Sequence, residues 1–245
     1  MSAKPRIETG IAGLDKMLTG GFVAGSANLV RGAPGTGKTV LALQYLLHGV
    51  ELNEPGLLIS FEEFPQSLQH DAQSLGWDLR AWQDKGLLHL YFTSPQVLLR
   101  SLESPSGPMS ELFAEKKIQR VVLDSVTHFT RLTNDPLELR HIYNRLINAL
   151  KREGTTSLLL AEEGQMEAQR IERGSLSFVV DTIILLRYVE VESAIQRAIA
   201  VMKMRSSDHV KEIRRYEISK GGLAVTGPFE NRENILTGIS HRVSR

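Results

Sequence analysis

Short apolar runs alternate with helical patterns over the first two thirds of the chain. Continuous apolar runs are typical of strands that are buried on both faces of a sheet. They predict strands over 27–30, 56–61, 87–92, 119–125 and 155–161. Apolar residues at helical spacing, or Gly and Pro at the expected ends, predict helices over 14–18, 40–47, 65–75 and 137–153. A further helix over 94–117 is interrupted by a Pro- and Ser-rich cluster at 104–108.

The pattern changes near residue 179. Strand-like segments cover 181–190, 197–205 and 213–219 and are joined by short loops. After Pro228 the sequence shows no clear helical or strand periodicity. Strands that alternate with helices predict a three-layer α/β core around a mostly parallel sheet. The later strands would extend that sheet as an antiparallel C-terminal meander. We therefore expect one domain over 1–245, with a flexible tail from about 228.

Composition narrows the class of protein. The chain is 42% hydrophobic and 23% charged, as is ordinary for a soluble globular protein, and its net charge is +1. That balance does not indicate a broad nucleic-acid-binding face. Cys is absent, which excludes disulfides and thiolate metal sites and fits a reducing compartment. Without a visible apolar leader or a membrane-length apolar run, we expect a cytoplasmic protein.

The segment 32–39 reads Gly-Ala-Pro-Gly-Thr-Gly-Lys-Thr and fits the G-x-x-x-x-G-K-[ST] phosphate-binding pattern. A predicted strand precedes it and a predicted helix follows it, as the chemistry requires. Glycines let backbone N–H groups approach a polyphosphate, and the helix adds the positive end of its dipole. The alternative is a glycine-rich turn that precedes a helix by chance. We expect ATP and Mg²⁺ here, bound by Pro34, Gly35, Thr36, Gly37, Lys38, Thr39 and Val40.

Acidic side chains follow the predicted strands. Asp124 ends an apolar strand, where a P-loop NTPase holds Mg²⁺, although it could instead cap the next segment. Glu62 and Glu63 could activate a water molecule. Alternatively, they could occupy the first turn of the next helix, where the helix dipole favours negative charge. Their position in the sequence does not distinguish these two roles. Because the carboxyl ends of parallel strands share one edge, these residues and 162–163 should converge on one crevice, with Thr39, Asp124 and Glu62 near the metal.

Residues 203–205, Lys-Met-Arg, place two cations on one face of a predicted edge strand. Lys203 and Arg205 could neutralise charge on a transferring phosphoryl group of a neighbouring subunit, in the manner of an arginine finger. The alternative is a pair of solvated edge charges that block unwanted strand pairing.

Taken together, these segments resemble the KaiC family of RecA-like ATPases. The resemblance rests on 9–15 and 20–21, the phosphate-binding segment, Phe61-Glu62-Glu63, 121–125, 181–186, 197–199 and 203–209. It implies a ring, usually of six subunits, with ATP between neighbours. One subunit would supply Lys38, Thr39, Asp124 and the base at Glu62-Glu63. The next would supply Arg197, Lys203, Met204, Arg205, Ser207 and His209.

The chain departs from circadian members of that family in two ways. Those proteins carry two such domains in tandem, and this chain carries one. Their C-terminal domain phosphorylates an adjacent Ser-Thr pair, where this chain has Ser177 and Phe178. Only one hydroxyl remains: Ser177 is a candidate for serine autophosphorylation, and the alternative is an ordinary polar loop residue.

Three functional hypotheses follow. The leading one is an oligomeric ATPase whose cycle drives a conformational change or the binding of a regulatory protein partner. The second is a DNA-dependent recombination or repair ATPase of the RecA or RadA type, with 169–174 as a lumen loop. The third is a nucleotide-binding signalling module with little turnover, against which the intact glutamate pair argues.

Overall fold

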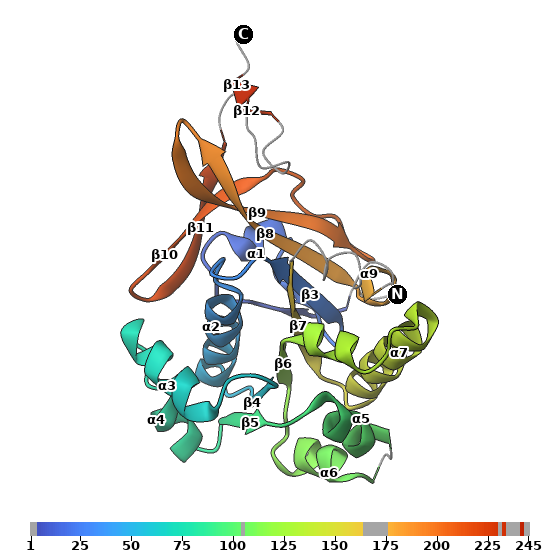
Figure 1. Ribbon diagram of the computed structural model, residues 1–245. Coiled ribbons are helices and arrows are strands. Elements are labelled where there is room, and N and C mark those ends of the chain that lie inside the picture. The colour runs from blue at the N-terminus through green and yellow to red at the C-terminus, as the bar shows by residue number, and fades with distance from the viewer. Residues whose placement is uncertain (1–3, 104–105, 164–175, 230–231, 234–240, 243–245) are drawn as a thin grey trace.

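A nine-stranded sheet forms the centre of the molecule in the computed structural model (Figure 1). The structure describes residues 4–103, 106–163 and 176–229, and the pairs 232–233 and 241–242. The strands are β3 (Ala27–Gly32), β4 (Gly56–Ser60), β5 (Leu88–Phe92), β6 (Arg120–Asp124), β7 (Thr156–Glu162), β8 (Thr182–Val191), β9 (Ala194–Met204), β10 (Arg214–Ser219) and β11 (Gly222–Pro228). Their order is β11-β10-β9-β8-β3-β7-β6-β4-β5. The strands from β8 to β5 run parallel, and β9, β10 and β11 continue antiparallel.

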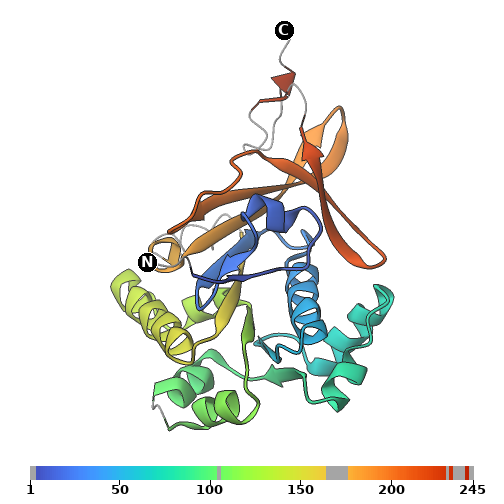
Figure 2. The same ribbon diagram turned by 180° about the vertical axis from the view of Figure 1, so that it is seen from behind.

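Helices cover both faces of the parallel strands, as Figures 1 and 2 show from opposite sides. One layer holds α2 (Lys38–Glu51), α3 (Pro65–Ser74) and α4 (Leu79–Asp84). The other holds α5 (Pro95–Glu103), α6 (Pro108–Glu115) and α7 (Pro136–Arg152). Shorter elements are β1 (Arg6–Ile7), α1 (Leu14–Met17), β2 (Phe22–Val23), η1 (Val126–Arg131), α9 (Leu176–Val179), β12 (Arg232–Glu233) and β13 (His241–Arg242).

Successive side chains of the parallel strands enter different cores. Leu58 of β4 belongs to the core under α2, whereas Leu57 and Ile59 belong to the core under α5, α6 and α7. This division follows from the two-residue period of a strand. Because both faces are covered, neither face needs polar residues, and the strands read as continuous apolar runs.

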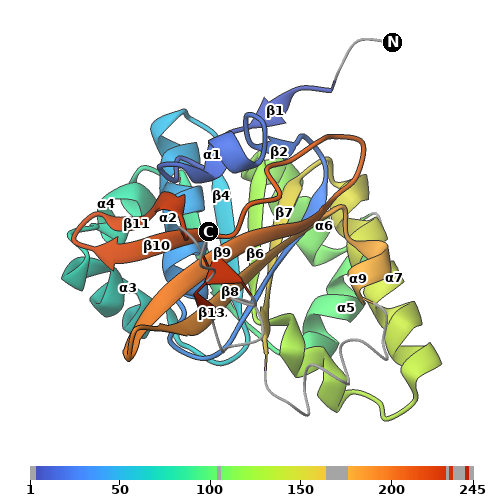
Figure 3. The ribbon, with the colours of Figure 1, turned by 90° about the horizontal axis from the view of Figure 1, so that it is seen from above.

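The meander crosses above the parallel part of the molecule, as the view from above shows (Figure 3). Its last strand, β11, is tied to α2, because the Leu223 N–H donates to Gln44 Oε1 at 2.8 Å. The pairing of β8 with β9 shifts by one residue between Ile183 and Ile184, so that Met202 is the extra residue of a bulge. The bulge lies next to Lys203, near the end of β9.

The predicted three-layer α/β fold with a mostly parallel sheet and a C-terminal antiparallel extension is confirmed. The sequence analysis missed α4 and β11. Two glycines and a proline weaken the strand signal of β11, and α4 is only six residues long. The strand expected to reach residue 205 ends at Met204. Of the tail expected from about 228, the structure describes 228–229 and the pair formed by β12 and β13. None of the helices in the described ranges has both the length and the apolarity that a membrane crossing demands.

Candidate active site

The phosphate loop, residues 33–37, joins the end of β3 to the start of α2. Gly35 and Gly37 have φ angles of 77° and 91°, which only glycine adopts without strain. Gly32 is fixed by space instead, because a Cβ there would lie 2.6 Å from the Thr36 hydroxyl and 2.7 Å from the Leu186 carbonyl oxygen. The tight turn therefore depends on glycine at each of these three positions.

Lys38 is buried at the first residue of α2 and reaches back across the loop. Its ammonium donates to the carbonyl oxygens of Gly32 at 2.9 Å and Ala33 at 3.1 Å. Burial lowers the pKa of Lys38, while the nearby carboxylates of Glu162 and Asp124 act in the opposite direction. The side chain thus has a position from which it can turn to a phosphate in the loop.

Thr39 and Asp124 meet between α2 and the end of β6. The Thr39 hydroxyl donates to Asp124 Oδ2 at 2.8 Å. Burial raises the pKa of Asp124, and the hydrogen bond from Thr39 opposes that rise. A hydroxyl and a buried carboxylate are oxygen donors of the kind that Mg²⁺ takes beside phosphate oxygens and water. Both residues therefore fit the expected metal position.

Glu62 and Glu63 follow β4 at the same edge of the sheet. The Ser60 hydroxyl accepts from the Glu63 N–H at 2.9 Å, which fixes the backbone where the strand ends. Glu62 is exposed, and its carboxylate lies 3.2 Å from Nε2 of His128 in η1. Burial raises the pKa of Glu63, and Asp124 adds to the rise. Both carboxylates therefore lie within electrostatic reach of Asp124.

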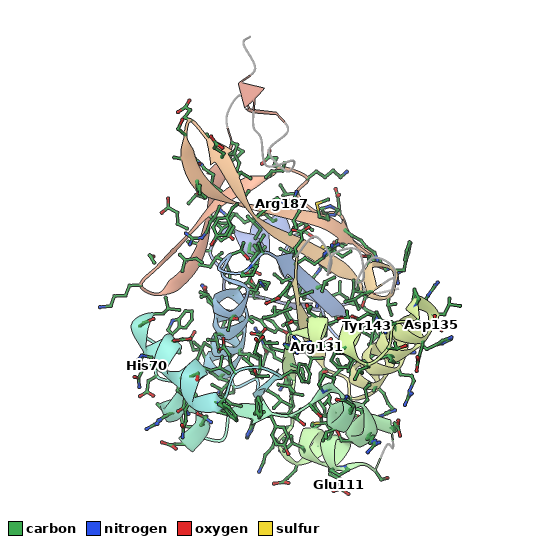
Figure 4. The ribbon with its side chains drawn as sticks, viewed as in Figure 1. His70, Glu111, Arg131, Asp135, Tyr143 and Arg187 are labelled. Atoms are coloured by element: carbon green, nitrogen blue, oxygen red, sulfur yellow. The ribbon has the colours of Figure 1, made fainter. Side chains whose placement is uncertain are left out.

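Glu162 and Glu163 complete this edge at the end of β7. The Glu162 N–H donates to the Thr127 hydroxyl at 2.8 Å, and the Glu163 N–H donates to the Gly32 carbonyl oxygen at 3.0 Å. Arg187 of β8, labelled in Figure 4, pairs with Glu163 at 3.2 Å. The predicted convergence of the strand ends is therefore present, from the phosphate loop to Glu62-Glu63.

Two tyrosines of the meander hold the phosphate loop, and the sequence analysis did not single them out. The Tyr188 hydroxyl donates to the Gly35 carbonyl oxygen at 2.6 Å, and the buried Tyr216 hydroxyl donates to the Thr36 carbonyl oxygen at 2.5 Å. Burial raises the pKa of Tyr216. Nothing in the local sequence marks these residues, because the contact joins segments more than a hundred residues apart.

Tyr216→Phe is expected to weaken ATP binding by about tenfold or less, because it removes one buried hydrogen bond to the loop, worth roughly 1 kcal/mol. The Kd for ATP, measured by titration, checks this. Tyr91→Phe is the matched control, since Tyr91 is exposed on β5 and should leave the Kd unchanged. An unchanged Kd in Tyr216→Phe would show that the hydroxyl does not shape the loop.

Lys203 and Arg205 converge on α9. The Lys203 ammonium donates to the carbonyl oxygens of Ser177 and Val180, each at 2.7 Å. Arg205 follows the end of β9 and donates to the Phe178 carbonyl oxygen. Met204, between the two cations, is buried in the core. Burial and the neighbouring Arg205 lower the pKa of Lys203. The two cations therefore reach one short helix from one side.

Ser207 and His209 extend this cluster toward the N-terminal segment. The Ser207 hydroxyl accepts from Arg6 and donates to the Asp208 carbonyl oxygen at 2.9 Å. His209 is half-buried, and its N–H donates to Asp208 at 2.9 Å. A pocket of about 600 Å³ opens beside the cluster. Its charged lining consists of Lys4, Arg6, Lys151, Asp181 and Arg205.

The candidate residues lie at opposite ends of β3. This strand pairs with β8 from Asn28–Thr182 to Gly32–Leu186, and β9 returns with Met204 opposite Thr182. Since β3 spans roughly 16 Å, Lys203 and Arg205 do not share an edge with the phosphate loop of their own subunit. We call the edge with the loop and Glu62-Glu63 the loop end, and the edge with Lys203, Arg205 and α9 the cation end.

Arg197 does not join the cation end. It pairs with Tyr188 across β8 and β9, and its guanidinium lies 5.6 Å from the centre of the Tyr188 ring. The hydroxyl of Tyr188 donates to the Gly35 carbonyl oxygen of the phosphate loop. The structure thus separates Arg197 from Lys203, with which it was grouped by resemblance.

Comparison with known proteins decides the family. The model of the KaiC ATPase family matches residues 7–230, nearly the whole chain. The chain belongs to the KaiC family of ATPases. The predicted resemblance is therefore confirmed.

Named relatives of this KaiC-family chain come from cyanobacteria. It is 36% identical over 245 residues to the circadian clock oscillator protein KaiC of Picosynechococcus, covering 99% of this chain and 47% of the relative. It is 35% identical over 245 residues to the circadian clock oscillator protein KaiC 1 of Synechocystis, covering 99% and 46%. The circadian clock protein KaiC3 of Synechocystis is 31% identical over 228 residues, covering 90% and 45%. The chain spans about half the length of these relatives.

Two further sequence predictions concern the segment before β8. The segment 169–174, considered as a DNA-binding loop, lies outside the described residues. Ser177 lies half-buried on α9, and its carbonyl oxygen accepts from Lys203. Phe178, which occupies the second position of the pair, is exposed.

Proposed function

We propose that this KaiC-family chain hydrolyses Mg²⁺-ATP in a head-to-tail ring of six subunits, with each nucleotide between the loop end of one subunit and the cation end of the next. The phosphate loop and Lys38 bind the triphosphate, and the Glu62-Glu63 pair orients water and accepts its proton. Lys203 and Arg205 of the neighbour neutralise charge that builds up on the transferring phosphoryl group. The hydrolysis cycle drives a conformational change that a regulatory protein partner recognises.

The observation that carries this proposal is the separation of the two ends along β3. Lys203 and Arg205 carry the charge of a phosphate-stabilising pair, and Lys203 is partly buried, yet both lie at the far edge of the sheet from their own loop. Contacts between different faces of identical subunits close into rings when the rotation allows it. A shared site would unite the two ends without any change in the fold of a subunit.

Mg²⁺ would be held by Thr39 and Asp124 and would supply charge neutralisation at the phosphates. The remaining roles belong to the side chains of this chain. Lys38 would leave the carbonyl oxygens of Gly32 and Ala33 for the phosphate oxygens. Tyr188 and Tyr216 would keep the loop in place while it does so.

Lys203→Ala is expected to lower ATP turnover by roughly tenfold to hundredfold, because one of two cations facing the phosphoryl group is lost. Phosphate release checks the rate, and circular dichroism checks the fold. Lys211→Ala is the matched control, since Lys211 is an exposed lysine on the segment that follows. Unchanged turnover in Lys203→Ala would remove the trans-acting role.

Mixing variants separates a shared site from a site within one subunit. Lys38→Ala and Lys203→Ala are each expected to be poorly active alone. An equal mixture should regain about a quarter of the wild-type turnover, because random head-to-tail association gives roughly one interface in four both intact groups. A mixture no more active than the mean of its two components would contradict the shared site.

A further inference from the structure

An aromatic pair, Phe64 and Phe92, is exposed at the loop end. The two ring centroids lie 4.3 Å apart with an interplanar angle of 32°. Phe64 retains 60% and Phe92 retains 40% of its accessible surface. Phe64 follows Glu63 directly, and Phe92 ends β5 opposite Ser60 of β4. The aromatic pair is therefore fixed beside the carboxylates that would face ATP.

A second exposed aromatic side chain, Phe178, lies at the cation end. It is 67% exposed on α9. Its backbone is held by three hydrogen bonds, because Arg205 donates to the Phe178 carbonyl oxygen and Lys203 donates to those of Ser177 and Val180. Phe178 is therefore fixed to the same two cations that would face the nucleotide of a neighbour.

Charge distinguishes the two ends. The loop end gathers the carboxylates of Asp124, Glu62, Glu63 and Glu162. At the cation end, the lining of the 600 Å³ pocket and Lys203 carry more positive than negative groups. Each end would repel a second copy of itself and attract the other end. This complementarity selects the loop end of a second copy of the chain as the occupant of the cation end.

We propose that Phe178 of one subunit packs against the aromatic pair, Phe64 and Phe92, of the next subunit. This contact rests on the proposed function, because it is the shared nucleotide that brings Glu63 of one subunit and Arg205 of the other together. Exposed aromatic side chains are enriched at interface centres, where they bury a large apolar area at a small cost in side-chain entropy. The packed aromatic rings would exclude water from the part of the shared nucleotide site beside them.

The contact also gives the ring its direction. Phe178 and the aromatic pair are different surfaces at opposite ends, so their contact is heterologous and repeats from one subunit to the next. The seam continues over further exposed apolar side chains on both surfaces. These are Val97 at the loop end and Met202 at the cation end.

The absence of cysteine from the chain permits a clean cross-linking test. The variants are Phe64→Cys, Phe178→Cys and the double variant, each treated with a short bis-maleimide in the presence of Mg²⁺-ATP. The expected result is a ladder of dimers, trimers and higher species for the double variant, and monomer for each single variant. The control is Phe64→Cys with Leu137→Cys, because Leu137 is 68% exposed on α7 and so matches Phe178 in accessibility.

Each result bears on the proposal. A ladder that forms in the double variant and not in the Leu137 control supports the contact. Dimers from a single variant would show that like ends meet, and an equal ladder in the control would show collision without docking, so either result overturns it. No ladder from the double variant, under conditions where its measured mass shows assembly with ATP, overturns the contact and leaves the proposed function intact.

A second measurement avoids cysteine altogether. Phe178→Ser should raise the protein concentration at half-assembly by about tenfold or more, as expected when an aromatic anchor is lost. Its monomer should bind ATP as the wild type does, because the loop end is untouched. Ile195→Ser is the control, since Ile195 is 77% exposed near the start of β9. An unchanged assembly concentration in Phe178→Ser overturns the proposal.

Discussion

Replacing both Glu62 and Glu63 with glutamine is expected to lower ATP turnover by about 10²- to 10⁴-fold, the range for loss of a general base. Glutamine keeps the shape of the side chain but cannot accept the proton of the attacking water. ATP should still bind, because Lys38 and the phosphate loop are unchanged. Phosphate release measures the turnover, and titration measures the Kd.

The single variants, Glu62→Gln and Glu63→Gln, show which of the two carboxylates accepts the proton. Both side chains are exposed, but Glu62 pairs with His128, whereas Asp124 and partial burial raise the pKa of Glu63. The larger loss identifies the base. Glu111→Gln is the control, because Glu111 lies on the outer surface of α6 (Figure 4). If the double variant keeps more than about a tenth of the wild-type rate, neither glutamate is the base.

Arg120→Met is expected to reduce the free energy of unfolding by about 3–5 kcal/mol, the cost of breaking a buried ion pair by removing one partner. Arg120 is 1% exposed and lies 2.6 Å from the Glu54 carboxylate. It also donates to the carbonyl oxygens of Glu8 and Tyr45, each at 2.8 Å. Methionine would remove both hydrogen bonds and leave the Glu54 carboxylate without its buried partner. Urea denaturation measures the change.

Arg145→Met is the matched control for this loss of stability. Arg145 pairs with Glu103 between α7 and α5, and both side chains are more than half exposed. An exposed pair of this kind contributes about 0–1 kcal/mol. Equal losses of unfolding free energy in the two variants would show that burial does not determine how much the Arg120–Glu54 ion pair contributes to stability.

The sequence predicted the local geometry of the loop end well. The spacing of Gly32, Gly37, Lys38 and Thr39 is a chemical requirement, and apolar runs mark strands that are buried on both faces. Parallel strands then bring their ends together, which placed Asp124 and the glutamates correctly relative to the loop.

Contacts between distant segments could not be predicted in this way. Arg120 sits in an apolar run, and nothing near it in the chain shows that Glu54 and Tyr45 surround it. The hold of Tyr216 on Thr36 depends on how the meander folds back across α2. The family resemblance grouped Arg197 with Lys203, but an extended strand carries the two residues apart.

The strand β9 has a mechanical consequence. It carries Arg197 beside the phosphate loop of its own subunit and Lys203 near the opposite edge of the sheet. Because a hydrogen-bonded strand resists stretching, a displacement at one end of β9 would be transmitted to its other end. In the proposed ring, β9 would therefore connect the phosphate loop of one subunit with the nucleotide bound by its neighbour.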